Sequence, residues 1–163
     1  MNTIKAVPIT NENFAPFGQF YPITAPQGHP LSGEIHKFYP DRLPASATTN
    51  VGYSPTVVHK PPRTVIAAVE YHTTTWEMIL PLTDDIVLHV APASGGTPVP
   101  HLAQAFVVPK NTLVKINAAI WHLAPLPASQ SSLTALIILP ECTYANDCTV
   151  VPLAKDEQFE IIL

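Results

Sequence analysis

Residues 64–82 read T-V-I-A-A-V-E-Y-H-T-T-T-W-E-M-I-L-P-L, and this stretch decides the predicted fold class. Residues 64–72 are rich in β-branched side chains and then become polar, whereas residues 76–82 are mostly apolar and contain a proline near their end. Both segments have the length and composition of short strands. The threonines between them fit a turn or an irregular crossing, so we expect two strands in close succession.

The same strand signals recur through the rest of the chain. The sequence has 19 prolines, spread out rather than clustered, and proline is excluded from helix interiors and from central strand positions. A chain divided this often cannot form a helical bundle. Because no helical pattern separates the apolar runs, we expect an all-β fold, a sandwich or barrel with antiparallel pairing. The further expected strands are residues 85–91, 103–108, 113–117 and 133–139.

Two short helices are expected at the ends of the chain. Thr10 can cap the first helix, Asn13 stands at the capping-partner position, and Gly18 is placed to end it. The segment A-K-D-E-Q-F-E at 154–160 is predicted to form a short C-terminal helix. We find no internal repeat and no linker, and 163 residues fit a single domain spanning 1–163.

The composition argues against several classes of protein. Hydrophobic residues make up 47% and charged residues 12%, which argues against disorder, and the net charge of -4 provides no basic surface for nucleic acid. No apolar run approaches the ~20 residues that a membrane helix needs, and the first residues lack the apolar core of a signal peptide. We therefore expect a soluble, cytoplasmic protein. Its cysteines, Cys142 and Cys148, are expected to be reduced bystanders.

Two carboxylates and two histidines stand out in a chain with few charges. Glu70 and His72 are two residues apart in a predicted strand, so their side chains share a face, and Glu77 follows on the next strand. His122 comes from a distant segment, N-A-A-I-W-H at 117–122. A small β-barrel can bring all four side chains to its interior, because each strand presents alternate residues inward. We therefore predict a divalent metal site, for which the donor types leave Mn, Fe, Ni and Zn open. Its ligands are Glu70, His72, Glu77 and His122.

The same four residues also allow a structural interpretation, in which the two glutamates lie on the solvent face and His72 is a hydrogen-bonded strand residue. His89, in the apolar run V-L-H-V, is expected to be a satisfied core residue, and His101 to lie at a strand entrance. Tyr71 and Trp76 are expected to be packing residues. The sequence contains no G-x-S-x-G motif, no glycine-rich phosphate loop and no dinucleotide fingerprint.

The spacing of the four site residues resembles a degenerate pair of cupin motifs. The first cupin motif is usually H-x-H-x3-4-E, and here Glu70 stands in place of its first histidine. Residues 117–122 keep the histidine of the second motif, P-x-G-x-x-H, without its proline and glycine. More narrowly, the chain resembles the ureidoglycolate lyase family in segments that together span most of its length. These are I-T-N-E-N-F-A-P-F-G at 9–18, residues 70–82, the stretch from A-F to W-H at 105–122, and A-N-D-C-T-V-V-P at 145–152.

The family resemblance implies a cupin-type antiparallel β-barrel, or jelly roll, that pairs into a homodimer. It also implies release of urea from ureidoglycolate, leaving glyoxylate, in purine-nitrogen breakdown. Within the predicted metal set we assign catalytic roles to His72, His122 and Glu77. The expected substrate-binding residues are Trp121, Asn117 and Lys115.

Departures from the family pattern bear on the substrate. The family often has a histidine and an arginine just before its W-H pair, where this chain has Asn117 and Ala118. A substrate carboxylate needs a cation, and the fork of an arginine suits it best. Two other functions therefore stand beside the lyase: another metal-dependent cupin enzyme, and a non-catalytic cupin that binds a small molecule. The cations that could bind a carboxylate are Arg42, Arg63, Lys60 and Lys115.

Overall fold

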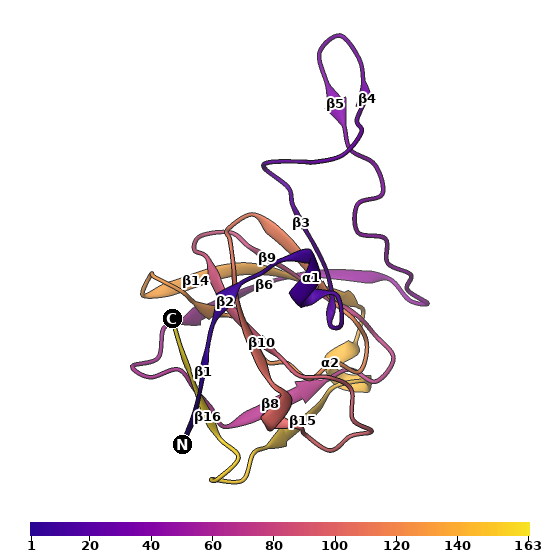
Figure 1. Cartoon of the computed structure of the whole chain (residues 1–163). Coiled ribbons are helices and arrows are strands. Elements are labelled where there is room, and N and C mark those ends of the chain that lie inside the picture. The colour runs from indigo at the N-terminus through magenta and orange to yellow at the C-terminus, as the bar shows by residue number, and fades with distance from the viewer.

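Short strands bounded by prolines and turns make up most of the regular secondary structure in the computed structural model, which describes residues 1–163 (Figure 1). The larger main sheet has the strand order β3 (Gly18–Pro22), β12 (Thr112–Ile116), β9 (Glu77–Pro81), β14 (Ser132–Pro140) and β6 (Val51–His59). The other main sheet has the order β13 (Leu126–Pro127), β10 (Ile86–Val90), β11 (Gln104–Val108) and β2 (Val7–Pro8). The two main sheets share no hydrogen-bonded strand pair, so the barrel is not closed.

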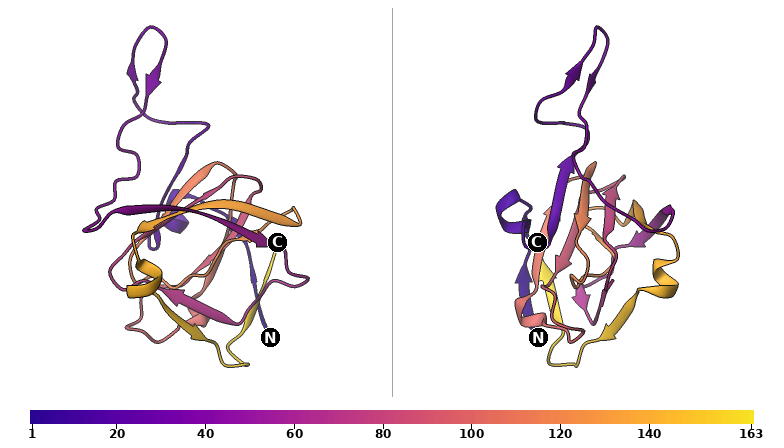
Figure 2. Two further views of the ribbon diagram at one scale, coloured as in Figure 1. Left: turned by 180° about the vertical axis from the view of Figure 1, so that it is seen from behind. Right: turned by 90° about the vertical axis from the view of Figure 1, so that its right-hand side faces the viewer.

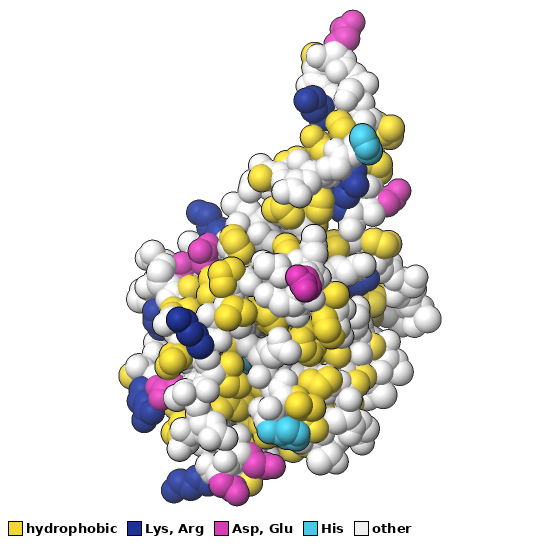
Figure 3. Space-filling view, in the orientation of Figure 1, with side chains coloured by type: hydrophobic (Ala, Val, Ile, Leu, Met, Phe, Trp, Pro, Cys, Tyr) yellow, Lys and Arg dark blue, Asp and Glu magenta, His cyan; other side chains and the backbone are white.

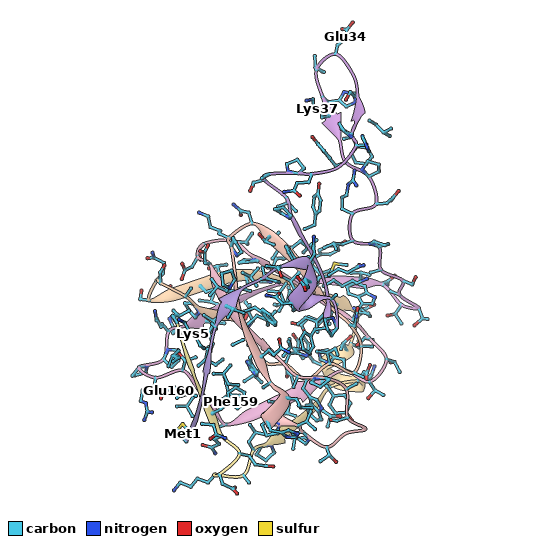
Figure 4. All side chains as sticks on the ribbon, in the orientation of Figure 1. Met1, Lys5, Glu34, Lys37, Phe159 and Glu160 are labelled. Atoms are coloured by element: carbon cyan, nitrogen blue, oxygen red, sulfur yellow. The ribbon has the colours of Figure 1, made fainter.

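Three smaller sheets complete the fold. One has the order β1 (Asn2–Lys5), β16 (Phe159–Ile162) and β7 (Val65–Ile66). In the others, β8 (Ala68–Tyr71) pairs with β15 (Thr149–Pro152), and β4 (Leu31–Ser32) pairs with β5 (Lys37–Phe38). Figure 4 labels Lys5 and Glu160 at the end of the molecule where β1 and β16 lie side by side.

The all-β prediction is confirmed, and each strand predicted from residue 64 onward is present. Pairing is antiparallel with two exceptions, because β1 runs parallel to β16 and β2 runs parallel to β11. Both exceptional strands lie within the first eight residues. No short turn joins either of them to its partner, so the hairpin signals that set strand direction elsewhere do not apply to them.

The predicted N-terminal helix is confirmed as α1 (Asn11–Phe14). The Asn13 backbone N–H donates to Thr10 Oγ1, and the Thr10 backbone N–H donates to Asn13 Oδ1, which closes the first turn. The helix ends before the predicted stop, and Gly18 instead opens strand β3.

The helix predicted over residues 154–160 was wrong. The backbone turns at Ala154, which accepts from the N–H groups of Glu157 and Gln158, and the chain then continues as β16. A strand is more stable than a helix there, because Phe159 and Ile161 are buried when β16 lies between β1 and β7. The helical turns nearest the C-terminus are α2 (Thr143–Asn146), and a 3₁₀ turn, η1, covers Pro100–Leu102.

Strand β10 divides the interior into two hydrophobic cores, because successive side chains of a strand point to opposite faces. Ile86 and Leu88 belong to the larger core, which is built from residues of both main sheets. Val87 belongs to the smaller core, which contains residues of β7, β8 and β16. His89 is buried against Phe159, as predicted for a core residue, but its Nε2 atom has no hydrogen-bond partner. Burial lowers the pKa of His89 to about 3, so this ring is neutral near neutral pH.

Residues 23–50 leave the body of the protein as a long excursion that carries the β4–β5 hairpin (Figures 1 and 2). None of these residues is buried, and apolar side chains such as Ile35 and Phe38 face solvent. Figure 4 labels Glu34 and Lys37 on the hairpin, and Figure 3 shows scattered apolar side chains and few charges over the body. No helix of the protein has the length and apolar character to cross a bilayer.

Gly18 provides a test of how closely β3 and β12 approach. A Cβ atom at this position would lie 1.9 Å from the backbone oxygen of Lys115, which cannot move without breaking the strand pairing. We expect Gly18→Ala to lower the free energy of unfolding by about 1–3 kcal/mol, measured by urea denaturation. Gly52→Ala is the control, because its Cβ atom would lie 3.7 Å from the nearest heavy atom. Equal stability of the two variants would contradict the close approach.

Candidate metal centre

The site forms where strand β8 meets the segment that contains His122. Glu70 lies in β8, and its backbone N–H and carbonyl bond to the carbonyl and N–H of His122, both at 2.8 Å. Residues directly opposite in an antiparallel pair point to the same face, so the side chains of Glu70 and His122 lie together. His72 follows two residues after Glu70, and Glu77 is the first residue of β9. The structure thus brings all four residues of the predicted metal set to one place.

The two imidazole rings converge on the Glu77 carboxylate. The Nε2 atom of His72 lies 3.1 Å from Glu77 Oε2, and the Nε2 atom of His122 lies 3.4 Å from the same oxygen. These three side chains are buried, and their ligand atoms all lie within 4.8 Å of one another. Glu70 is partly exposed, with Oε1 at 4.0 Å from His122 Nε2. It therefore forms the rim of the site rather than its centre.

Both rings are oriented by hydrogen bonds on their far side. The Nδ1–H group of His72 donates to the backbone oxygen of Asp147, and that of His122 donates to the backbone oxygen of Ile120, both at 2.8 Å. A carbonyl can only accept, so these bonds place a proton on each Nδ1 and turn each Nε2 toward Glu77. The Nε2 atom of His122 is buried without a hydrogen-bond partner.

The donor set fits a divalent metal ion. Two imidazole Nε2 atoms and one carboxylate oxygen are ligands that suit transition metals such as Mn, Fe, Ni and Zn. The Nδ1–H bonds to backbone carbonyls supply the outer contacts that metal-binding histidines usually have. A buried, unpartnered Nε2 atom is also what a site shaped for a metal ion presents.

The charges of the protein side chains alone favour a proton on His122 and an ionised Glu77. Burial by itself would raise the pKa of Glu77, but contacts with His122 and His72 lower it to about 2. Burial by itself would lower the pKa of His122, but the negative Glu77 carboxylate, 3.4 Å from its Nε2 atom, outweighs burial, so the pKa is raised. A carboxylate and an imidazolium therefore compensate each other, and a bound metal ion would displace the imidazolium proton.

A cavity of about 250 Å³ leads to the two carboxylates. Ser54 and Thr56 from β6 and Tyr144 from α2 line it with hydroxyl groups, and Glu70 and Glu77 lie among its walls. The rest of the lining is Pro55, Ala124, Pro125 and Ile137. No lysine or arginine lines this cavity, so a metal ion would be its main source of positive charge.

Three residues for which the sequence predicted no role in the site lie beside it. The ring of Tyr144 packs edge-on against His72 at 6.2 Å between centroids, and Cys148 Sγ lies 3.6 Å from Glu70 Oε2. The Asp147 carboxylate accepts hydrogen bonds from the loop between His72 and Glu77, and these bonds lower its pKa to about 2 although burial opposes the shift. Asp147 and Cys148 lie in the segment 145–152, which had entered as a point of family resemblance, whereas no sequence signal pointed to Tyr144.

The residues predicted to bind substrate lie elsewhere. Trp121 is buried in the smaller core, where it packs on Tyr71 and donates a hydrogen bond from Nε1 to Ser94. It points away from the site because adjacent residues of an extended segment, here Trp121 and His122, point to opposite faces. Lys115 Nζ donates to the backbone oxygen of Pro44, and Asn117 is exposed. The structure does not bring any of these three side chains to the cavity that leads to Glu77.

The all-β fold and the convergent histidines and carboxylates together define an all-β protein with a candidate metal centre. The sequence profile described as ureidoglycolate lyase matches residues 1–160. The chain therefore belongs to the ureidoglycolate lyase family, as the sequence motifs indicated.

Solved structures similar to this chain include oxalate decarboxylases. One is the Bacillus subtilis enzyme, from work on its Mn(II) centres, with 17% identity, a TM-score of 0.45, and coverage of 65% of this chain and 24% of that one. Another is the formate complex of the Lactobacillus farciminis enzyme, with 10% identity, a TM-score of 0.46, and coverage of 64% and 27%. The matched region is thus about a quarter of these longer chains. No curated protein sequence matches this chain significantly.

Glu77→Gln tests the metal centre. The substitution removes the carboxylate between two imidazole rings and leaves a neutral amide of the same shape, so a cation loses its anionic ligand. Loss of a hydrogen-bond partner of a metal ligand typically lowers metal affinity about 10–100-fold. Loss of a ligand itself should cost more, so we expect Co²⁺ affinity to fall at least a hundredfold, measured by equilibrium dialysis and elemental analysis. Glu12→Gln, at an exposed carboxylate of α1, is the control. Retained affinity in Glu77→Gln would exclude this carboxylate as a ligand.

Proposed function

We propose that the protein is a metal-dependent lyase that releases urea and glyoxylate from ureidoglycolate. The observation that supports this most directly is the convergence of His72 Nε2 and His122 Nε2 on the buried Glu77 carboxylate in a member of this family. The cavity of about 250 Å³ beside these groups suits a substrate of this small size. In this proposal the protein acts in the cytoplasm, where its free cysteines stay reduced.

His72, Glu77 and His122 would hold the metal ion. When bound, the ion would act as a Lewis acid that makes the substrate hydroxyl more acidic. The bonds from the two Nδ1–H groups to backbone carbonyls keep both rings aimed at one point during turnover. Because both Nε2 atoms are then occupied, neither ring is free to carry a proton.

Glu70 is the group at the rim that can move the proton. Its carboxylate lines the cavity and is partly exposed, whereas the neighbouring side chains of Glu77 and His122 are buried. In the reaction, Glu70 takes the proton of the substrate hydroxyl, the electron pair of the C–N bond moves to the departing nitrogen, and a carbonyl forms on carbon. Glu70 then returns the proton to that nitrogen, which leaves as urea, so the reaction needs no co-reactant.

Substrate contacts in this proposal come from the cavity hydroxyls. Ser54, Thr56 and Tyr144 can donate hydrogen bonds to substrate oxygens, and Glu70 can accept from ureido N–H groups. The chain supplies no ammonium or guanidinium group here, so the substrate carboxylate would depend on the metal ion for charge. The same absence favours a second candidate, a metal-dependent enzyme that acts on a small, polar and uncharged molecule.

The activity assay is direct. Metal-replete protein is incubated with ureidoglycolate, and glyoxylate is followed against a control without protein. We expect turnover that is lost on chelation, and a 10²–10⁴-fold lower kcat in Glu70→Gln with metal content unchanged, which is the usual size of a general acid–base contribution. Absence of turnover by protein shown to contain metal would reject the lyase and leave the second candidate.

We also propose that the protein is a homodimer. Strand β6 has nine residues and pairs with β14 on one side only, and Tyr53 and Val57 on it are exposed. A long open strand edge promotes pairing with other chains unless it is covered, and a second copy can cover it symmetrically. Light scattering coupled to gel filtration should give twice the monomer mass of 17.7 kDa, and a monomer at micromolar concentration would contradict the pairing.

A further inference from the structure

We propose that Asp147 is a positioning residue of the metal centre, which orients the His72 ring and fixes the loop that joins His72 to Glu77. The proposal rests on the assignment of His72 and Glu77 as ligands. Asp147 makes no contact with the cavity that leads to the site, so it acts through other residues rather than on a substrate.

The carboxylate of Asp147 is surrounded by hydrogen-bond donors from three consecutive threonines. The backbone N–H of Thr73 donates to Oδ1 at 2.7 Å, and those of Thr74 and Thr75 donate to Oδ2 at 2.9 and 3.0 Å. The hydroxyl groups of Thr74 and Thr75 donate to the same Oδ2 atom, at 2.8 and 3.2 Å. The anion thus shapes the whole loop, because few other groups could satisfy three adjacent N–H donors at once.

The loop held in this way is the link between two ligands. His72 is the residue immediately before the threonines, and Glu77 follows one residue after Trp76. A shift of the loop backbone would therefore change the separation of His72 Nε2 and Glu77 Oε2, now 3.1 Å. The indole of Trp76 is itself tied, donating to the backbone oxygen of Ser46 at 2.6 Å.

The backbone of Asp147 contacts His72 directly. Its carbonyl accepts the Nδ1–H of His72 at 2.8 Å, so one residue holds both the ring and the loop that begins next to it. Asp147 is in turn fixed by α2: its N–H donates to the Thr143 carbonyl, and the buried Thr143 hydroxyl donates to Pro140 at the end of β14. These hydrogen bonds thus connect the His72 ring, through α2, to strand β14 of the larger main sheet.

Asp84 provides a matched control for the general effect of losing such a carboxylate. It is also a loop-binding aspartate, accepting from the N–H groups of Ser129 and Gln130 at 2.8 Å and from the Ser129 hydroxyl at 2.6 Å. It follows β9 at the strand end opposite Glu77. Asp84→Asn should therefore destabilise the fold by a comparable mechanism without reaching the metal centre.

The experiment compares Asp147→Asn, Asp84→Asn and the wild type by two readouts. The first is Co²⁺ affinity and the visible absorption of the bound ion; we expect Asp147→Asn to lose about 10–100-fold in affinity and to change the spectrum, with Asp84→Asn unchanged. The second uses metal-free, ¹⁵N-labelled protein and follows the His72 Nδ1–H resonance, assigned by its absence in His72→Asn. This signal should be protected from exchange in wild type and Asp84→Asn and lost in Asp147→Asn.

Each result decides the proposal. Support requires that both readouts change in Asp147→Asn, and a change in only one of them, or in neither, overturns it. If the wild type binds no Co²⁺, the metal-dependent function fails separately, and the Nδ1–H resonance alone decides whether Asp147 orients His72. If Asp147→Asn does not fold, Thr74→Val, which removes only the hydroxyl bond to Oδ2, replaces it, and a smaller change in the same direction is required.

Discussion

A carboxylate buried between two imidazole rings is the constraint on which the rest of this structure depends. An unpaired charge cannot be buried at the position of Glu77 without a large cost, so the contacts to His72 and His122 must form for the fold to be stable. Meeting that requirement joins parts of the chain that no hairpin connects, since Glu70 in β8 pairs with the distant His122. The site therefore links β8 and β9 to the segment that contains His122, as well as offering ligands.

Much of this could be predicted from the sequence because strand periodicity is simple. Alternation places Glu70 and His72 on one face whatever the tertiary fold, and prolines mark where the strands end. The capping pair Thr10 and Asn13 is equally local and formed as expected. The positions that failed are those where a local pattern competes with burial: the polar stretch before Phe159 reads as a helix, yet the apolar residues beyond it are buried as a strand.

The surroundings of the site were beyond sequence reasoning for a different reason. Asp147 is separated from His72 by 75 residues, and its hydrogen bonds depend on how α2 packs. Trp121 is next to His122 in sequence, but the alternation that places the histidine in the site places the indole in the smaller core. Lys115 lies in the strand before Asn117, where its ammonium group meets Pro44 instead of the cavity. Such outcomes depend on tertiary packing, for which a single sequence carries no signal.

The excursion at residues 23–50 has a consequence for how this protein can vary. It places no buried side chain in either core, and it connects β3 and β6, the two edge strands of the larger main sheet. The entropic cost of closing a flexible loop rises only with the logarithm of its length, by about 0.6 kcal/mol of free energy for each doubling. Its length is therefore nearly decoupled from folding, and insertions, deletions or an inserted foreign segment can accumulate there while the ligand-bearing strands keep their register.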